Sequence, residues 1–329
     1  MSWRRRTFGQ WLGLAALSDG GVAHAQEIDL WPQRPLQLIV VYPPGGVGDA
    51  AARALALGLK SLLGAAVIVQ NRAGAGGWIG LDALTRAAPD GHTLAFSAIS
   101  PLTLNPLVGS HLPDLEARVI PVASVMRTPV LILGTPAFKG RTFSDLIEQA
   151  RRYPGGMRWA TSGVGTTGHL VMANIAHQSR SAVVHVAYRG GGQPLNDALG
   201  GQFEVLSTNL GALQLQYVNK GRLKALAVGA PTRLPALPQV PTLFELGFAS
   251  ANLDSLFGVF APANTPPQRV ERLNHAINQV LKTASFQVGL NSSFGLQAGG
   301  ESAVEFRRTI AQERAKYEAM MRRNPDLLK

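Results

Sequence analysis

The sequence predicts a two-lobed α/β fold in which each lobe is a mostly parallel sheet flanked by helices. Apolar runs typical of buried strands alternate with segments of helical periodicity, as in parallel sheets with helical crossovers. A strand, a glycine-rich turn and a helix follow one another twice, starting near residues 36 and 157. The 329 residues, 46% of them apolar and 16% charged, suit a globular chain of about two domains.

Residues 1–25 have the pattern of a removable signal peptide. Arginines at positions 4–6 precede a short apolar stretch at residues 8–17, and Ala23-His24-Ala25 is a small-x-small cleavage site. Arg5-Arg6-Thr7-Phe8 also fits a twin-arginine signal in outline, so the export route is Sec or twin-arginine. An amphipathic first helix of the mature fold is the alternative. No later stretch reaches the roughly 18 apolar residues of a membrane-spanning helix, so we expect an exported, soluble protein.

The first strand–turn–helix unit begins with an apolar run at residues 36–42, which predicts a buried parallel strand. Pro43-Pro44-Gly45-Gly46 ends this strand. A helix is expected from about residue 48 to residue 63, with Leu55, Leu59 and Leu62 on one face and Gly64 as its stop. The alternation continues with a strand at 66–70, a glycine-rich turn at 73–77, a helix at 79–87 and a strand at 93–96.

The second unit repeats this order. A short strand at 158–161 leads into the turn Ser162–Gly168, and a helix is expected at 169–177. A strand at 183–188, a helix through 195–199 and a strand at 203–206 follow. Right-handed crossovers between such strands imply a second parallel sheet.

Two segments are expected to connect the lobes. Adjacent apolar runs at 120–126 and 129–133 indicate a crossing from one lobe to the other, and residues 223–228 with the proline-rich stretch 231–241 indicate the return. We therefore expect lobe 1 to comprise residues 26–126 and 229–329, and lobe 2 to comprise residues 127–228.

Two helices are expected to close the chain. Thr265-Pro266-Pro267-Gln268 and Ser302-Ala303-Val304-Glu305 both have the form of a capping box, the first with proline at N1. Phe306, Ile310 and Tyr317 give the last helix an apolar stripe, which we expect to pack on lobe 1.

Both glycine-rich turns indicate an anion site. Each ends a strand and begins a helix, so it presents unpaired backbone N–H groups at the positive end of a helix dipole. Ser162, Thr166 and Thr167 add hydroxyl donors for carboxylate oxygens. The alternative is that the glycines only shape tight turns. The simpler role for Asp49 is to cap the helix, and the alternative is contact with an ammonium or hydroxyl group of a ligand. The simpler interpretation of His169 is that it lies on the helix surface or takes part in local packing.

A dinucleotide-binding enzyme is the main rival interpretation. Gly163–Gly168 fits G-x-G-x-x-G, and Gly46–Ala51 fits its G-x-G-x-x-A variant. A dinucleotide site needs an acidic residue about 20 residues later, at the end of the next strand, to bind the ribose. Those strand ends carry Asn71-Arg72 and Tyr188-Arg189, where arginine would suit the 2′-phosphate of NADP. Motifs for other nucleotide, zinc or serine-nucleophile sites are absent, although a triad assembled from distant residues remains open. The lack of cysteine excludes disulfides, thiolate metal sites and a thiol nucleophile.

The formal net charge of +11 favours an anionic partner. Without residues 1–25, the remaining 28 Lys and Arg against 19 Asp and Glu leave +9. These basic residues are scattered, which indicates a basic surface or a small anionic solute and argues against nucleic acid.

A resemblance to a known family rests on a series of motifs spread over nearly all of the mature chain. They are Tyr42–Asp49, Val69–Gly77, Ala88–Leu94, Gly163–His169, Val186–Gly191, Gly221–Val228, Val240–Thr242 and Phe257–Ala263. In this order they resemble the Bug family, the periplasmic solute-binding proteins of tripartite tricarboxylate transporters.

The resemblance implies a type II-like clamshell in the periplasm, a monomer that closes on a small carboxylate without enzymatic activity, cofactor or metal. The membrane subunits of a tripartite tricarboxylate transporter would be its partners. The ligand-binding residues it implies are Tyr42, Pro44, Gly45, Gly46, Val47, Gly48 and Asp49 in lobe 1, Ser97 and Ser100 on the pocket wall, and Ser162, Gly163, Gly165, Thr166, Thr167, His169, Tyr188, Thr208 and Asn209 in lobe 2.

One departure from the family pattern bears on the ligand. Family members often have Asp-Asn-Leu where this chain has Thr208-Asn209-Leu210. The missing carboxylate would be a natural partner for a ligand ammonium, so we expect an organic acid and not an amino acid.

Overall fold

The computed structural model describes residues 31–108, 112–288 and 299–328. The signal peptide predicted at residues 1–25 lies outside them and stays a prediction. From Pro32 onward the strands form a sheet in the order β2-β1-β3-β9-β4-β7-β5-β6, with β8 paired to β4. Among the described helices, none is long and apolar enough to cross a membrane.

One half of the sheet is built from the first strand–turn–helix unit. Its parallel strands are β1 (Leu36–Val40), β2 (Val67–Asn71) and β3 (Thr93–Ala98), with Leu38 of β1 opposite Val69 and Leu94. β9 (Asp254–Pro262) joins antiparallel to β3. The helices here are α1 (Val47–Leu63), α2 (Trp78–Thr85) and α3 (Ser100–Thr103). The predicted strands and longer helices are confirmed.

The face predicted for α1 is correct only in part. Leu55 and Leu59 are buried, but Leu62 is 46% exposed. α1 also packs closely on α8 (Pro267–Leu281): a Cβ at Gly58 would lie 2.4 Å from Val280 Cγ1, so only glycine permits this approach.

The other half comes from the second unit. β5 (Met157–Thr161), β6 (Val183–Ala187) and β7 (Val205–Asn209) are parallel, as predicted. They are accompanied by α5 (Thr167–Ser179), α6 (Gly192–Leu199), α7 (Ala212–Asn219) and α4 (Phe143–Arg152). The sequence analysis missed α4 and α7. A capping box between Thr142 and Asp145 starts α4 and was a usable signal.

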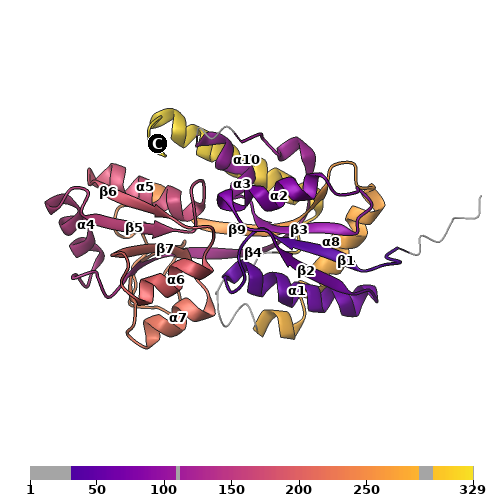
Figure 1. Cartoon of the computed structure of the whole chain (residues 1–329), viewed down its shortest axis with the longest axis horizontal. Helices are drawn as coiled ribbons and strands as arrows, with labels where there is room; N and C mark the ends of the chain where they lie inside the picture. Colours follow the sequence, from indigo (N-terminus) through magenta and orange to yellow (C-terminus); the bar gives the residue numbers. More distant parts are fainter. Residues whose placement is uncertain (1–30, 109–111, 289–298, 329) are drawn as a thin grey trace, which may run out of the picture. The chain divides into compact units, whose positions relative to one another are not determined.

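The two halves share one long strand. β4 (Val119–Gly134) was expected as two separate runs but is continuous over 16 residues. It pairs with β9 up to Pro129, and from Val130 it pairs with β7 and with β8 (Lys224–Gly229). Register shifts beside Pro121 and Ser124 accommodate the proline in this ladder. In Figure 1, β1–β3 and β5–β7 lie on opposite sides of β4 and β9.

The two terminal helices begin differently. At α10 (Ala303–Arg323) the predicted capping box is confirmed: Glu305 N donates to Ser302 Oγ at 3.2 Å, and the Glu305 carboxylate accepts from Ser302 N at 2.8 Å. At α8 the predicted box is wrong. Pro266 is the N-cap, and the Thr265 hydroxyl, one residue too early, donates to Pro262 O at 2.8 Å.

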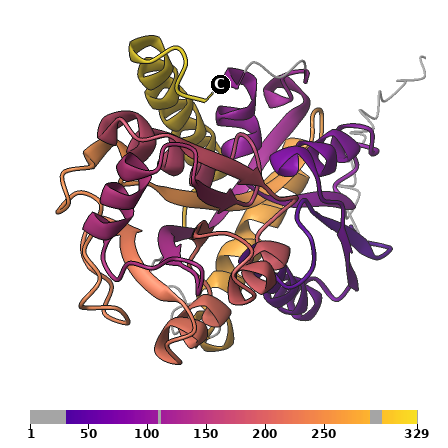
Figure 2. The same ribbon diagram turned by 60° about the vertical axis from the view of Figure 1, so that its left-hand side comes forward.

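Helix α10 contributes to the core of both halves. Phe306 and Ile310 pack in the cluster that contains Ile39 and Phe260, as expected for lobe 1. Tyr317, farther along the same stripe, packs instead in the cluster around Trp159 of β5. Figures 1 and 2 show α2, α3 and α10 on one face of the sheet and α1 on the other. The helices thereby leave the carboxyl ends of the parallel strands free to form a site.

Candidate ligand-binding site

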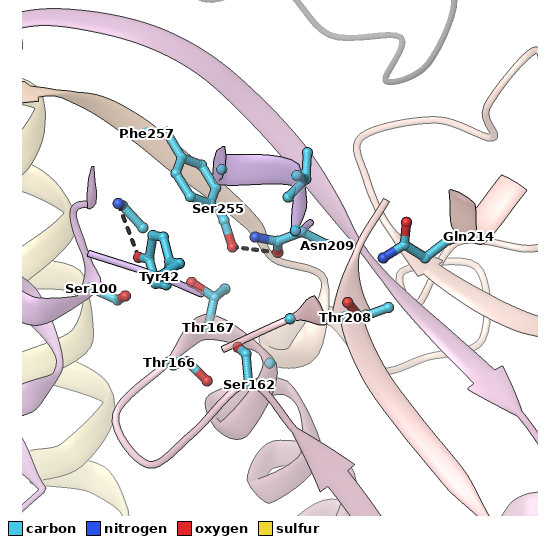
Figure 3. A pocket seen from close by; sticks show the side chains of 16 residues that line it. Tyr42, Ser100, Ser162, Thr166, Thr167, Thr208, Asn209, Gln214, Ser255 and Phe257 are labelled. Carbon is cyan, nitrogen blue, oxygen red and sulfur yellow. Dashed lines mark hydrogen bonds between the residues drawn. The ribbon is translucent and has the colours of Figure 1, made fainter. Parts of the chain in front are cut away.

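Residues that follow the carboxyl ends of the parallel strands in both halves line a single cavity (Figure 3). The space not filled by atoms, with the open solvent at its mouth included, is ≈ 530 Å³. The lining contains hydroxyls, amides, backbone and two aromatic rings, and no charged residue. It comprises Tyr42, Gly46, Val47, Gly48, Ala98, Ser100, Ser162, Thr166, Thr167, Gly168, Gly191, Thr208, Asn209, Gln214, Ser255 and Phe257.

Two helix N-termini open onto this cavity. Gly46 is the N-cap of α1, and Thr166 is the N-cap of α5. The first turn of a helix leaves its backbone N–H donors without an intrahelical acceptor. In each helix this applies to the two residues after the N-cap, which in α1 are Val47 and Gly48. These free donors and the two aligned helix dipoles give the uncharged cavity a positive potential that suits an anion.

Two further helices begin beside the cavity. α6 starts after Gly191, which lines it, and Gln214 lies in the first turn of α7. The sequence pattern predicted the helix that α6 forms but did not assign its start to the site. It did not predict α7, which carries no glycine-rich fingerprint.

Tyr42 supplies a neutral phenol to the site. Burial raises the pKa of Tyr42 to about 12, against the lowering effect of hydrogen bonds with Ala98 N, Ser97 and Ser100. Ala98 N donates to Tyr42 Oη at 3.1 Å, and the ring packs edge-on against Phe257 with centroids 5.9 Å apart. Tyr42 therefore stays protonated at neutral pH, in a fixed orientation.

Several polar side chains of the lining have unused hydrogen-bonding capacity. Ser255 Oγ donates to Asn209 Oδ1 at 2.8 Å, which leaves the Asn209 amide nitrogen without a partner (Figure 3). Within the described part of the chain, the side chains of Thr167, Thr208 and Gln214 make no hydrogen bond although all three are buried. Their polar atoms are not among the fully buried ones that lack a partner, so they face the cavity and are free to bind a polar ligand.

Asp49 lies behind the first turn and does not line the cavity. Its carboxylate accepts from Gly45 N at 3.1 Å, from Asn71 Nδ2 at 2.8 Å and from Arg53 Nε at 3.1 Å. Burial alone would raise its pKa, but these donors outweigh burial and hold the pKa of Asp49 below its usual value. The carboxylate thus fixes the turn from behind. It does not cap α1, whose N-cap Gly46 has no side-chain cap hydrogen bond.

His169 lies in the same way behind the second turn. Its Nδ1 accepts from Gly165 N at 3.3 Å, and its ring stacks on that of His185 with centroids 4.3 Å apart. His185 Nε2 is in turn 2.7 Å from Thr161 Oγ1. Burial, with a smaller effect of His185, lowers the pKa of His169 to about 4. Both rings are therefore neutral at pH 7 and support the turn through packing and hydrogen bonds.

Ten of the predicted ligand-binding residues line the cavity, and eight do not. The eight that lie outside the lining are Pro44, Gly45, Asp49, Ser97, Gly163, Gly165, His169 and Tyr188. The structure also places six residues in the lining that the sequence analysis did not name as a site. Gly168 and Gly191 belong to turns already singled out, and Phe257 begins one of the family motifs, whereas no motif included Ala98, Gln214 or Ser255.

The glycine-rich turns of the two halves also touch each other on either side of the cavity. A Cβ at Gly190 would lie 2.2 Å from Pro43 Cδ, and one at Gly192 would lie 2.9 Å from Pro44 O. On the other side, a Cβ at Gly76 would lie 2.7 Å from Val164 O. Close approach of backbone to backbone thus holds the two halves together around the cavity.

Comparisons with known proteins give a consistent result. The family model for the tripartite tricarboxylate transporter family receptor matches residues 51–325. The protein BugT of Bordetella pertussis is 36% identical over 272 residues, which cover 81% of this chain and 82% of BugT.

Solved structures share the fold. A Rhodopseudomonas palustris protein, Rpa4515 with adipate, has a TM-score of 0.83 and 29% identity, covering 89% of this chain and 97% of that one. The periplasmic binding protein BugD has a TM-score of 0.82 and 25% identity, covering 89% and 98%. The predicted two-lobed α/β fold is confirmed.

Proposed function

We infer the function from the family to which this chain belongs, that of tripartite tricarboxylate transporter receptors. We propose that it is a periplasmic solute-binding protein that captures a small carboxylate between its lobes. It would deliver this carboxylate to the membrane subunits of such a transporter. The adipate in the structure of its relative Rpa4515 supports a carboxylate ligand. The predicted residues that line the cavity are proposed as its ligand-binding residues.

One observation carries this proposal: two helix N-termini, from different halves of the sheet, open onto one cavity whose lining has no charged side chain. A carboxylate placed there would accept from the free N–H groups of Val47, Gly48, Thr167 and Gly168. Each helix terminus stabilises an anion by roughly 0.3–1 kcal/mol when exposed and up to about 2 kcal/mol when partly buried. Exclusion of water strengthens these contacts further.

The crossing strand β4 supports the proposed lobe boundaries. Residues up to about 126 and from about 229 would form lobe 1, and residues 127–228 would form lobe 2, because β4 changes partner between Pro129 and Val130. A ligand that contacts both lobes shifts the protein toward the closed arrangement as far as it prefers that state. We further propose that the protein is a monomeric receptor without enzymatic activity, exported by the Sec or twin-arginine route.

A thermal-shift experiment tests the proposal. Purified protein is heated with millimolar succinate, malate, adipate or citrate, and with NADP in parallel. At a ligand concentration of 100 Kd, stabilisation of about 2.7 kcal/mol is expected, which raises Tm by several degrees. Stabilisation by NADP alone would favour the oxidoreductase, and no response to any carboxylate would refute the proposed function.

A further inference from the structure

We propose that Gln214, together with Thr208 and Asn209, selects the ligand by the group at the end remote from its anchored carboxylate. The group that these residues select is one that carries oxygen, either a second carboxylate or a hydroxyl. A ligand with an ammonium group at that end is rejected. This inference rests on the proposed function and adds a specificity-determining residue that no sequence motif indicated.

Gln214 is a buried amide without a protein partner. It lies in the first turn of α7, lines the cavity and is 5% exposed. Its side chain makes no hydrogen bond to any described residue, and in Figure 3 the amide points toward Thr208 and Asn209. A primary amide has two donors and an acceptor. The amide atoms of Gln214 are not among the fully buried polar atoms that lack a partner, so they face the open space of the cavity, where a ligand can reach them. The ligand is the partner that the cavity leaves room for.

The neighbours of Gln214 offer donors of the same kind. Asn209 Oδ1 already accepts from Ser255 Oγ, so the free part of that amide is its N–H₂ group. The buried hydroxyl of Thr208 is unpaired among the described residues and can donate or accept. Together these groups can donate to an oxygen but present no carboxylate to an ammonium.

This polar cluster lies away from the groups proposed to hold the carboxylate. In Figure 3, Gln214 and Thr208 lie on one side of the pocket, while Tyr42, Ser100 and Thr166 lie on the other. The ring of Phe257 forms an apolar part of the wall. The lining therefore suits a short acid with an oxygen function at each end and an apolar middle.

Isothermal titration calorimetry with matched acids tests this assignment. The probes are succinate against butyrate, glutarate against pentanoate and adipate against hexanoate, which differ only in the far carboxylate. We expect the wild-type protein to bind at least one diacid ten-fold or more tightly than its monoacid. In Gln214→Leu the affinity for that diacid falls ten-fold or more, while the affinity for the monoacid changes less than three-fold.

Gln216 provides the matched control. It lies two residues farther along α7 with an exposed side chain, so Gln216→Leu makes the same chemical change outside the cavity and should alter neither affinity. Gln214→Glu keeps the size of the side chain and tests the sign of the selection. In this variant the affinity for succinate relative to that for the ω-amino acid 4-aminobutyrate should fall ten-fold or more. If Gln214→Leu does not fold, Gln214→Glu decides whether Gln214 selects the ligand.

The outcomes separate this inference from the proposed function. Three results would overturn the role of Gln214 while carboxylate binding stands. The wild-type protein could bind diacid and monoacid equally, Gln214→Leu could keep the diacid affinity, or Gln214→Leu could lose the same affinity for both acids. A wild-type protein that binds none of these acids, nor malate or citrate, would contradict the proposed function as well.

Discussion

His169 is a buried imidazole behind the second turn, stacked on the half-buried ring of His185, and it makes stability depend on pH. The pKa of His169 is lowered to about 4, whereas the unfolded residue titrates near 6.5. Between these values the unfolded chain binds more protons than the folded protein, so stability falls as the pH is lowered through this window. A shift of this size corresponds to roughly 3 kcal/mol.

Urea unfolding between pH 7.5 and pH 4.5 measures this effect. The free energy of unfolding should decrease steadily below pH 6.5, and His169→Gln, which keeps an acceptor for Gly165 N but cannot titrate in this range, should have a shallower dependence. An identical slope in both proteins from pH 6.5 to pH 5 would show that His169 is not responsible.

Asp49 is the corresponding support of the other turn. Asp49→Ala removes the acceptor of Gly45 N and one of the two acceptors of Asn71 Nδ2, which keeps Tyr42 O, so the turn before α1 loses part of its support. A hydrogen bond to a charged group contributes about 1.5–3 kcal/mol, and we expect ligand affinity to fall about ten-fold. Calorimetry with the tightest-binding carboxylate measures this.

Asp145→Ala is the control for Asp49. That acid belongs to the capping box of α4, away from the cavity, so its removal should lower Tm without changing affinity. If Asp49→Ala bound the ligand as tightly as the wild-type protein, the turn would not need its carboxylate.

Residue type explains why these supporting roles were hard to predict. The turns could be located because glycine and proline mark them directly. Asp49 and His169 lie next to those turns in sequence. Whether such a residue supports the turn or contacts the ligand depends on the direction of its side chain, which the sequence does not show. Gln214, Ser255 and Phe257 reach the cavity through the order of strands and helices, which local sequence does not encode.

At the scale of elements, the glycines at the start of α6 allow the two halves to meet. Gly192 is the first residue of α6 and has no positive φ, so alanine there does not strain its own backbone. The added methyl group would nevertheless lie 2.9 Å from Pro44 O on the opposite turn. We expect Gly192→Ala to hinder closure and weaken carboxylate binding by ten-fold or more, with little loss of thermal stability.

Gly200 ends the same helix and provides the control. A Cβ there would meet its nearest atom, Asp197 O, at 3.5 Å, which is ordinary contact. Affinities of Gly192→Ala and Gly200→Ala should therefore differ strongly. Equal affinities would mean that the contact with Pro44 does not matter for binding.

The strands were more predictable than the starts of helices. Apolar runs located β1, β2, β3, β5, β6 and β7, because strands are rich in apolar and β-branched residues. The run at residues 223–228, expected as a connection between the lobes, forms β8. The capping box at Thr265 failed because the two prolines that follow move the N-cap to Pro266, out of reach of the threonine hydroxyl. The break expected at residues 127–129 is absent. Pro129 stands at the end of the ladder between β4 and β9, just before β4 pairs with β7 and β8, and the end of a ladder is a position that tolerates proline.

At the scale of the whole molecule, the last quarter of the chain completes the fold of the first. β9 lies between β3 and β4, α8 packs on α1 and β4, and α10 packs in the cores of both halves. A chain that stops after Leu253 should therefore fail to fold, because β3 and β4 lose the strand between them. Circular dichroism and urea titration should show no cooperative transition for it.

A chain that stops after Arg323 is the control, since it keeps β9, α8 and α10. It should unfold cooperatively, with somewhat lower stability. Cooperative unfolding of the chain that stops after Leu253 would show that the first half of the sheet is stable without β9.

The late position of β9 also has a consequence during synthesis. Until residue 262 leaves the ribosome, β3 and β4 have no strand to bridge them, and the hydrophobic surface that Phe260 and Phe306 later cover stays open. We expect the nascent polypeptide to remain loosely structured for most of translation. A chain in that condition can be threaded through a narrow translocation pore before it collapses, which makes secretion in the unfolded form compatible with this topology.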